Sequence, residues 1–219
     1  MLRRTLCRSA AFALVLTLSS FAQNNVYDNG PTNGTVDAWT INFGFIVSDT
    51  FTLGTQSDVN GLNFAAWLFP GDVLESAELS ITSSEFGGTT FFDGVVNFSQ
   101  SNCTSNQFGF NVCQENGSFN SVNLNPGTYW LNLQNAVVNT GDPVYWDENG
   151  GPSSASENSL GTIPSESFTV LGADTSTTCW GCGCRNSPGC APEPGSLTLS
   201  LSGVTTIFGV LAALRRRIF

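Results

Sequence analysis

Residues 38–45 read AWTINFGF, and residues 46–53 continue as IVSDTFTL. In the first half, apolar side chains at positions 39, 41, 43 and 45 alternate with smaller or polar ones at 40, 42 and 44. Successive side chains of a β-strand point to opposite faces, so this period of two predicts a half-buried strand. We therefore expect one strand over Ala38 to Phe45, with Trp39 on its apolar face, and a second over Ile46 to Leu53.

Similar runs of β-branched and aromatic residues recur downstream, separated by Gly, Asn, Asp and Pro. They predict further strands near Gly61 to Leu68, Val73 to Thr82, Phe91 to Phe98, Gly109 to Cys113, Phe119 to Leu124, Thr128 to Leu133 and Ser167 to Leu171. Leu74 is out of phase with the apolar residues that follow it, which predicts a bulge or a strand start near Glu75. Asn125-Pro126-Gly127 predicts a turn, because Pro presets one dihedral and Gly allows positive φ.

No helix-period pattern longer than two turns occurs between residues 24 and 178. About nine short strands, with turn signals every 8 to 12 residues or so, indicate an all-β fold. A β-sandwich of the jelly-roll-like type is the architecture that we expect. A parallel α/β fold is disfavoured because the crossover helices it needs are missing.

The first 22 residues have the organisation of a secretory signal peptide. Arginines at positions 3, 4 and 8 precede an uncharged run from Ala10 to Leu18, and small residues at 20 and 22 suit a signal peptidase. The run is too short to span a bilayer, and Cys7 precedes it, which argues against a lipoprotein. The residues around the two N-terminal arginines match a twin-arginine signal poorly. We expect export by the general secretory route and cleavage after Ala22.

The C-terminus predicts a membrane span. Pro192-Glu193-Pro194 is followed by twenty uncharged residues, Gly195 to Leu214, and then by Arg215-Arg216-Arg217. At about 1.5 Å per residue, a helix of this length spans the hydrocarbon core of about 30 Å. The arginines would hold the C-terminus in the cytoplasm, so that everything before the helix faces outward.

This order closely resembles the PEP-CTERM sorting signal, over residues 192–219. The resemblance implies an exosortase, a membrane protease-transpeptidase, as a partner that cuts near Pro192, Glu193 and Pro194. It makes Arg215, Arg216 and Arg217 the end of the signal. It also implies that the helix over 195–214 holds the protein in the inner membrane before the protein reaches the cell surface or the extracellular matrix, among exopolysaccharide. A permanent single-pass anchor is the alternative.

The exported part is strongly acidic. Of the 7 basic residues only Arg185 lies between the end segments, whereas all 17 acids lie there, so residues 23–194 carry a net charge of −16 without Lys or His. Nucleic acids and anionic membrane surfaces are therefore poor partners, and we expect no binding to nucleic acid. Ca²⁺ would relieve the repulsion among the acids, and a solvated acidic surface is the alternative.

Six cysteines remain after signal removal, an even number that predicts disulfides in an exported chain. Cys103 and Cys113 flank a short polar stretch and are expected to pair. The other four, Cys179, Cys182, Cys184 and Cys190, allow three pairings. Zinc binding and a redox role for Cys179 and Cys182 are alternatives, although structural zinc sites usually split their ligands into separated pairs. We interpret 23–172 as the ectodomain and 173–191 as a Cys-rich stalk.

The exported part lacks the residues of common catalytic sites. Without histidine or lysine it cannot form a Ser-His-Asp triad, a Ser-Lys dyad or a Schiff base. A pair of carboxylates acting as a glycosidase is the remaining enzymatic alternative. Asp174-Thr175-Ser176 is similar to an aspartic-protease triplet, but the chain has no second copy. We therefore predict a protein that is not an enzyme.

Aromatic residues beside carboxylates indicate a ligand-binding surface instead. The candidates are Tyr129, Trp130, Tyr145, Trp146 and Asp147, because exposed rings stack on sugars and carboxylates bind hydroxyl groups. The alternative is that Trp39, Trp130 and Trp146 belong to the core. Asp142, Asp147, Glu148 and Asn149 could supply oxygen ligands to Ca²⁺, outside any EF-hand spacing.

Two weaker resemblances concern the ectodomain. Asp28-Asn29-Gly30-Pro31, residues 47–53 and Asn60-Gly61-Leu62 are similar to the opening of choice-of-anchor extracellular domains. Residues 127–131 resemble a late strand of jelly-roll, carbohydrate-binding-like modules. The sequence thus predicts an exported surface or matrix protein with a structural or interaction role. A carbohydrate- or Ca²⁺-binding recognition module is the alternative.

Overall fold

The regular structure is built from antiparallel β-strands. A computed structural model describes residues 24–175, and within this range every regular element is a strand. The strands are β1 (Asn24–Asp28), β2 (Ala38–Thr40), β3 (Ile46–Leu53), β4 (Ser57–Leu68), β5 (Leu74–Ser84), β6 (Gly87–Ser105), β7 (Asn111–Leu124), β8 (Gly127–Val138), β9 (Tyr145–Asp147), β10 (Ala155–Glu157), β11 (Gly161–Ile163) and β12 (Phe168–Asp174). The all-β class predicted from the sequence is confirmed.

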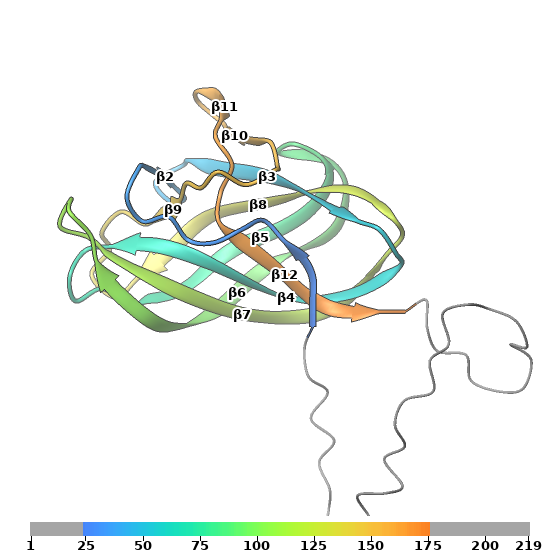
Figure 1. Cartoon of the computed structure of the whole chain (residues 1–219), viewed down its shortest axis with the longest axis horizontal. Coiled ribbons are helices and arrows are strands. Elements are labelled where there is room, and N and C mark those ends of the chain that lie inside the picture. Colours follow the sequence, from blue (N-terminus) through green and yellow to red (C-terminus); the bar gives the residue numbers. More distant parts are fainter. Residues whose placement is uncertain (1–23, 176–219) are drawn as a thin grey trace, which may run out of the picture. The chain divides into compact units, whose positions relative to one another are not determined.

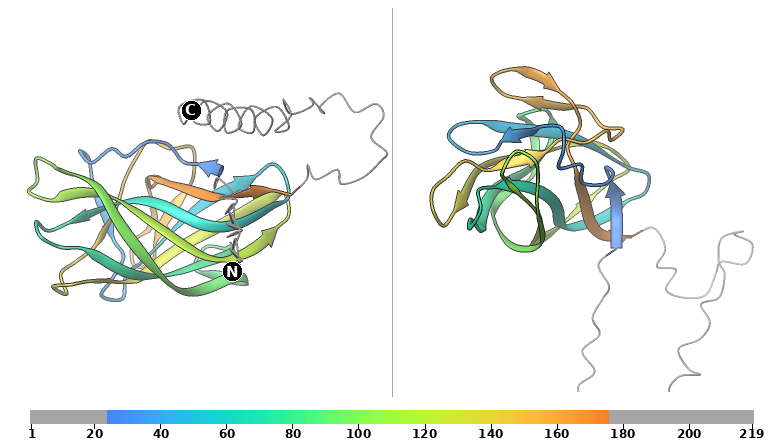
Figure 2. Two further views of the ribbon diagram at one scale, coloured as in Figure 1. Left: turned by 90° about the horizontal axis from the view of Figure 1, so that it is seen from below. Right: turned by 60° about the vertical axis from the view of Figure 1, so that its left-hand side comes forward.

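The strands form one sheet that curls over on itself (Figures 1 and 2). Its order is β1-β12-β4-β7-β6-β5-β8-β3-β10-β11, with β9 pairing to both β2 and β4. The long strand β6 makes the turn of the sheet, because residues 87–97 pair with β5 whereas residues 98–105 pair with β7. All of these pairs are antiparallel, so the sheet needs no crossover helices.

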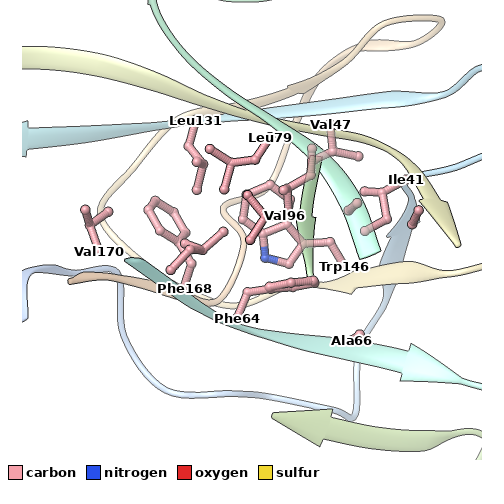
Figure 3. Packing of buried hydrophobic residues seen from close by; sticks show 14 of the residues in the cluster. Ile41, Val47, Phe64, Ala66, Leu79, Val96, Leu131, Trp146, Phe168 and Val170 are labelled. Atoms are coloured by element: carbon pink, nitrogen blue, oxygen red, sulfur yellow. The ribbon is translucent and has the colours of Figure 1, made fainter. Parts of the chain in front are cut away.

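The concave side of the sheet encloses the main core (Figure 3). Trp146 is fully buried at its centre, and its ring packs edge-on against Phe64 and Phe168, with centroids 5.9 and 5.6 Å away. Leu79 and Leu131 enter the same core from β5 and β8. Alternate residues of each long strand therefore bury their apolar side chains on one face.

A second, smaller apolar cluster lies on the opposite face of β4. Ala65 and Trp67 alternate with the inward-facing Phe64 and Ala66, and they pack with Val112 of β7. Phe108, Phe110 and Tyr145 surround the Trp67 cluster. This outer cluster provides the base of the candidate site described below.

Most predicted strands are present. The prediction over Ile46 to Leu53 matches β3, and the bulge near Glu75 is confirmed by a register shift between Leu74 and Ser76 against β8. Asn125 and Pro126 connect β7 to β8 as predicted. The runs 109–113 and 119–124 belong to one strand, β7, and β12 extends to Asp174, two residues beyond the predicted end of the ectodomain.

The strand predicted over Ala38 to Phe45 is wrong after Thr40. Residues 41–45 form a turn in which Phe43 has a φ of 57° and the Phe45 amide donates to the Asn42 carbonyl oxygen. Phe43 and Phe45 are 65% and 39% exposed, whereas Ile41 is fully buried. The alternating apolar residues therefore do not share one strand face, because the chain turns at residues 41–45.

Candidate functional site

Segment 29–35, between β1 and β2, forms one wall of the candidate site. Asp147 of β9 holds this segment: its Oδ1 accepts hydrogen bonds from the Gly34 amide at 2.7 Å and from Trp67 Nε1 at 2.6 Å. Its Oδ2 accepts from the Asn33 amide at 2.8 Å. Burial raises the pKa of Asp147, and these three hydrogen bonds oppose that rise because they stabilise the charged form.

Further contacts press segment 29–35 against β7 and the β6–β7 turn. Gln114 Nε2 donates to Thr32 Oγ1, and Gln107 Nε2 donates to the Thr35 carbonyl oxygen at 2.8 Å. Gly34 has a φ of +66° and lies so close to Val112 that an added Cβ would meet Val112 Cγ2 at 3.2 Å. The positive φ favours glycine at this position, and the Val112 side chain would have to shift slightly to admit a Cβ.

A β-bulge forms the opposite wall. The pairing of β6 with β7 shifts between Ser101 and Thr104, and Asn102 within the bulge adopts a φ of 50°. Bulges of this kind redirect side chains away from the regular alternation. Cys103 in the bulge forms a disulfide with Cys113 of β7, which confirms the predicted pairing. Asn102 and Thr104 make no side-chain hydrogen bond within residues 24–175.

Between these walls lies a pocket of about 410 Å³. A second pocket of about 450 Å³ is lined by segment 29–33 and residues 149–152, and the two pockets share Thr32 and Asn33 in their linings. We call the two together the polar groove. No Asp or Glu lines either pocket, although the described residues include 16 acids and no Lys, Arg or His.

An exposed aromatic ring stands beside the polar groove. Phe108 lies in the turn between β6 and β7, which projects at the left of Figure 1, and it is 53% exposed. Its ring stacks on Trp67, with centroids 5.6 Å apart and planes 21° from parallel. Phe108 follows Asn106 and Gln107, both of which line the groove. Stacking on the buried Trp67 holds one face of the Phe108 ring in place.

Two of the five predicted ligand residues belong to the main core. Trp146 is fully buried and donates from Nε1 to the Ser167 carbonyl oxygen at 2.9 Å, so the prediction that its ring is exposed for stacking is wrong. Tyr129 is also buried, stacked on Phe51 with its hydroxyl donating to the Asn125 carbonyl oxygen. The alternative of a core role, considered from the sequence for Trp146, is correct.

The other three lie on the outer face of the sheet. Trp130 is half-buried on β8, opposite Thr50 and Thr82 in the neighbouring strands. Tyr145 is half-buried against Phe110 in the cluster around Trp67. Asp147 is buried and holds segment 29–35, so it positions the polar groove rather than lining it.

The residues suggested for Ca²⁺ are each engaged elsewhere. Glu148 Oε2 accepts from Trp39 Nε1 at 3.1 Å, Asn149 Nδ2 donates to the Asn29 carbonyl oxygen at 2.9 Å, and Asp142 Oδ2 accepts from Thr140 Oγ1 at 3.1 Å. Across residues 24–175 no group of three or more His, Cys, Asp or Glu side chains is arranged to hold a metal ion. Binding of Ca²⁺ stays a prediction.

Several acids are buried in the interior. Burial raises the pKa of Asp49 to about 6 and that of Glu115 to about 8, and it raises the pKa of Glu166 well above its usual range. Asp49 Oδ2 accepts from the Glu166 amide at 2.8 Å. None of these carboxyl groups lines the polar groove, and all three are fully buried. They therefore lack the access to substrate that a catalytic carboxylate pair needs.

Most residues that line the groove were not predicted from the sequence; the exception is Asn149, suggested there as a Ca²⁺ ligand, which lines the second pocket. Residues 99–107 read SQSNCTSNQ, an uncharged polar run followed directly by Phe108. In an otherwise acidic domain, such a run ending at an aromatic residue could have marked this wall. Segment 29–35 carries no comparable signal, because only the tertiary contact with Asp147 brings it to the site.

Other predictions fall outside the described residues. These include the signal peptide, Cys179, Cys182, Cys184 and Cys190, and the sorting motif with its helix at 195–214. In the part that the structure does describe, no helix is long and apolar enough to cross a membrane. Comparison of the sequence with models of known protein families and with curated proteins finds no match.

Proposed function

We propose that this chain is an exported cell-surface or matrix protein that is sorted by an exosortase-like system and associates with exopolysaccharide without catalysing a reaction. The observation that carries the proposal is the order of Pro192-Glu193-Pro194, the uncharged run Gly195 to Leu214 and the three arginines at 215–217. Each part has a physical role in a transient membrane anchor that faces outward. The N-terminal signal peptide agrees with this topology.

The disulfide between Cys103 and Cys113 supports an oxidising destination. Disulfides persist in extracellular and periplasmic compartments and are rare in the cytosol. The charge of the exported part also suits release, because self-repulsion keeps acidic domains soluble and apart.

We interpret the curled sheet as a β-sandwich of the jelly-roll-like type. Strand β6 supports this interpretation, because it pairs with β5 in one half and with β7 in the other. The apolar core between the two halves also agrees with such packing. Sandwiches of this kind commonly display binding surfaces on rigid strands and their turns.

The second candidate function is a carbohydrate-recognition module, and the polar groove favours it. Its uncharged lining beside an exposed aromatic ring has the composition of a sugar-binding surface. The two functions are compatible, since a matrix protein that binds sugar would be retained by it.

The test is the intact mass, with terminal peptides, of the protein recovered from its own cells, matrix and medium. We expect a chain that begins near Gln23 and ends between Pro192 and Pro194. Replacing Pro192, Glu193 and Pro194 with Ala should leave residues 215–219 attached in the membrane fraction. Replacing Ser187, Pro188 and Gly189 with Ala is the matched control and should not alter processing. A wild-type chain that retains residues 215–219 in the membrane would refute exosortase-type sorting.

A further inference from the structure

The polar groove offers two neighbouring pockets, each large enough for one ligand unit. Its two pockets, of about 410 and 450 Å³, follow segment 29–35 and share Thr32 and Asn33. Pockets for single ligands generally have volumes of about 300–1,000 Å³. A linear polymer could therefore place successive units in the two pockets.

The lining of the groove selects for a neutral ligand. Asn33, Asn102, Gln107 and Gln114 supply amide groups, and Thr104 supplies a hydroxyl group. Amides and hydroxyls both donate and accept hydrogen bonds, as sugar hydroxyls do. With 16 acids and no base among residues 24–175, the surrounding domain repels anionic polymers. Cationic ligands would in turn find no carboxylate in the lining.

Some polar groups of the groove are held in place, and others have no hydrogen-bond partner among the residues that the structure describes. The Asn33 and Gly34 amides are held by Asp147, and the Cys103–Cys113 disulfide ties the opposite wall to β7. Asn102 and Thr104, in contrast, keep their side chains without hydrogen bonds within the described part of the chain. The restrained backbone lowers the entropic cost of binding, while the exposed side chains of Asn102 and Thr104 are available to a ligand.

Phe108 adds an exposed apolar ring that directly follows Gln107 of the groove lining, although the ring itself lines neither pocket. Its ring is 53% exposed and is backed by Trp67, so it is available to a ligand without any rearrangement of the core. The axial C–H face of a sugar ring is apolar and packs on aromatic rings, while the equatorial hydroxyls point to polar partners. An aromatic platform beside an amide-lined groove matches both parts of such a ligand.

We infer that the polar groove binds a neutral polysaccharide, with Phe108 stacking on one sugar ring and Asn102 bonding to hydroxyl groups of the chain. The inference rests on the proposed function, because a location among exopolysaccharide is what would bring the protein into contact with such a ligand. It assigns a binding site to residues outside the aromatic set suggested by the sequence.

The experiment is affinity electrophoresis of the full chain, purified in a mild detergent, through native gels that contain a soluble polysaccharide. Laminarin, dextran and galactomannan are the neutral probes, and alginate and polygalacturonate are the anionic ones. We expect at least one neutral probe to retard the protein in a concentration-dependent way and neither anionic probe to do so. Absence of retardation by all three neutral probes, or retardation by an anionic one, would overturn the inference.

Variants locate the site. Asn102→Gly removes the amide while keeping the positive φ accessible, and Phe108→Ala removes the platform. Each should weaken binding at least fivefold. Asn102→Gly should leave the unfolding temperature unchanged, whereas Phe108→Ala, which also loses the stacking on Trp67, should remain folded at the temperature of the binding measurement. Phe43→Ala removes a similarly exposed ring, 65% exposed, from a turn outside the groove and should bind as the wild type does. Equal binding by all three variants, or loss confined to Phe43→Ala, would show that the groove is not the site.

Failure of this inference is distinguishable from failure of the proposed function. Processing near Pro192 to Pro194, together with no retardation by the neutral probes, would leave the sorting proposal standing and remove the binding site. If retardation depends on Asn102 and Phe108 while the chain keeps its C-terminus in the cell membrane, the binding site stands and the sorting proposal falls.

Discussion

Among single residues, Glu115 occupies an unfavourable environment for a charge. It faces inward from β7, opposite Phe64 of β4, and neither of its carboxyl oxygens has a hydrogen-bond partner within residues 24–175. Burial raises its pKa from 4.5 to about 8. The folded protein therefore holds a proton on Glu115 at neutral pH, because an unpaired charge would be costly there.

This pKa predicts how stability depends on pH. Because the pKa of Glu115 is higher in the folded than in the unfolded chain, its contribution is fully present below pH 4.5 and is lost as the pH rises through about 8. We expect the free energy of unfolding to fall by a few kcal/mol, to order of magnitude, between pH 5.5 and 8.5. Urea titrations at several pH values measure this fall.

Glu115→Gln should flatten that pH dependence, since an amide does not titrate. The replacement of the solvent-exposed Glu75 with Gln is the matched control and should leave the slope as it is in the wild type. An unchanged slope in Glu115→Gln would show that Glu115 is ionised in the folded protein. Glu166, whose pKa burial and the nearby Asp49 raise, contributes in the same direction.

The run Tyr145-Trp146-Asp147 shows how far single residues can be predicted. The sequence indicates that aromatic and acidic groups gather there, but in a strand of three residues it does not show which side chain faces the core. Trp146 turns inward because β9 pairs with β4 and continues the sheet over the core. Asp147 therefore faces outward, where it holds segment 29–35.

At the scale of elements, strands with a sustained alternation were predictable, and most of the short strands were not. β3, β5 and β8 carry enough alternating residues to establish their period, whereas β10 and β11 have three residues each. Those short strands exist because β10 pairs with β3 and with β11, a tertiary contact without a local signature. The predicted strand over Ala38 to Phe45 was too long, because the apolar alternation continues beyond the end of β2 through a turn at Phe43.

The pairing of β12 with β4 depends on a close backbone approach at Gly172. The register shifts there, and an added Cβ would lie 2.2 Å from the Asp58 carbonyl oxygen. Gly172→Ala should therefore destabilise the protein by about 2–4 kcal/mol, because backbone rather than a flexible side chain must move. Thermal unfolding followed by circular dichroism measures the loss. Gly54→Ala, which meets no atom within 4 Å, should have little effect, and equal effects would contradict this account.

The disulfide between β6 and β7 should stabilise both the fold and the groove. Cys103 and Cys113 are separated by 10 residues, and closing a loop of that size is worth about 2–3 kcal/mol through the unfolded state. A Cys103→Ser, Cys113→Ala double variant should lose that stability in urea titrations. It should also bind neutral polysaccharide less tightly, because Asn102 lies in the bulge that the disulfide restrains. Unchanged binding in a folded double variant would show that the disulfide does not contribute to the binding site.

At the scale of the whole molecule, charge is the dominant feature. The described residues include 16 acids and no base, so repulsion among carboxylates opposes the compact state. We expect the unfolding temperature to rise by a few degrees when NaCl increases from about 10 to 300 mM, since salt screens this repulsion. Differential scanning calorimetry measures the shift. An unfolding temperature that does not respond to salt would contradict the expectation, and a larger rise in CaCl₂ at equal ionic strength would support the Ca²⁺ alternative.

The candidate site emerges only in the assembled molecule. Its walls come from segment 29–35 and from residues 102–114, about seventy positions apart, and Asp147 connects the first wall to the sheet. The sequence predicts the chemistry of export and the all-β class through local patterns. It does not predict the groove, because that depends on which loops the curled sheet brings together.

Hydrogen–deuterium exchange of the full chain, with and without the neutral polysaccharide that retards it most, tests the central claim most directly. We predict slower exchange of backbone amides in segments 29–35 and 102–110, and unchanged exchange in the β10–β11 hairpin at 155–163, which lines neither pocket. Protection confined to 155–163, or no protection in either wall of the groove, would contradict the claim.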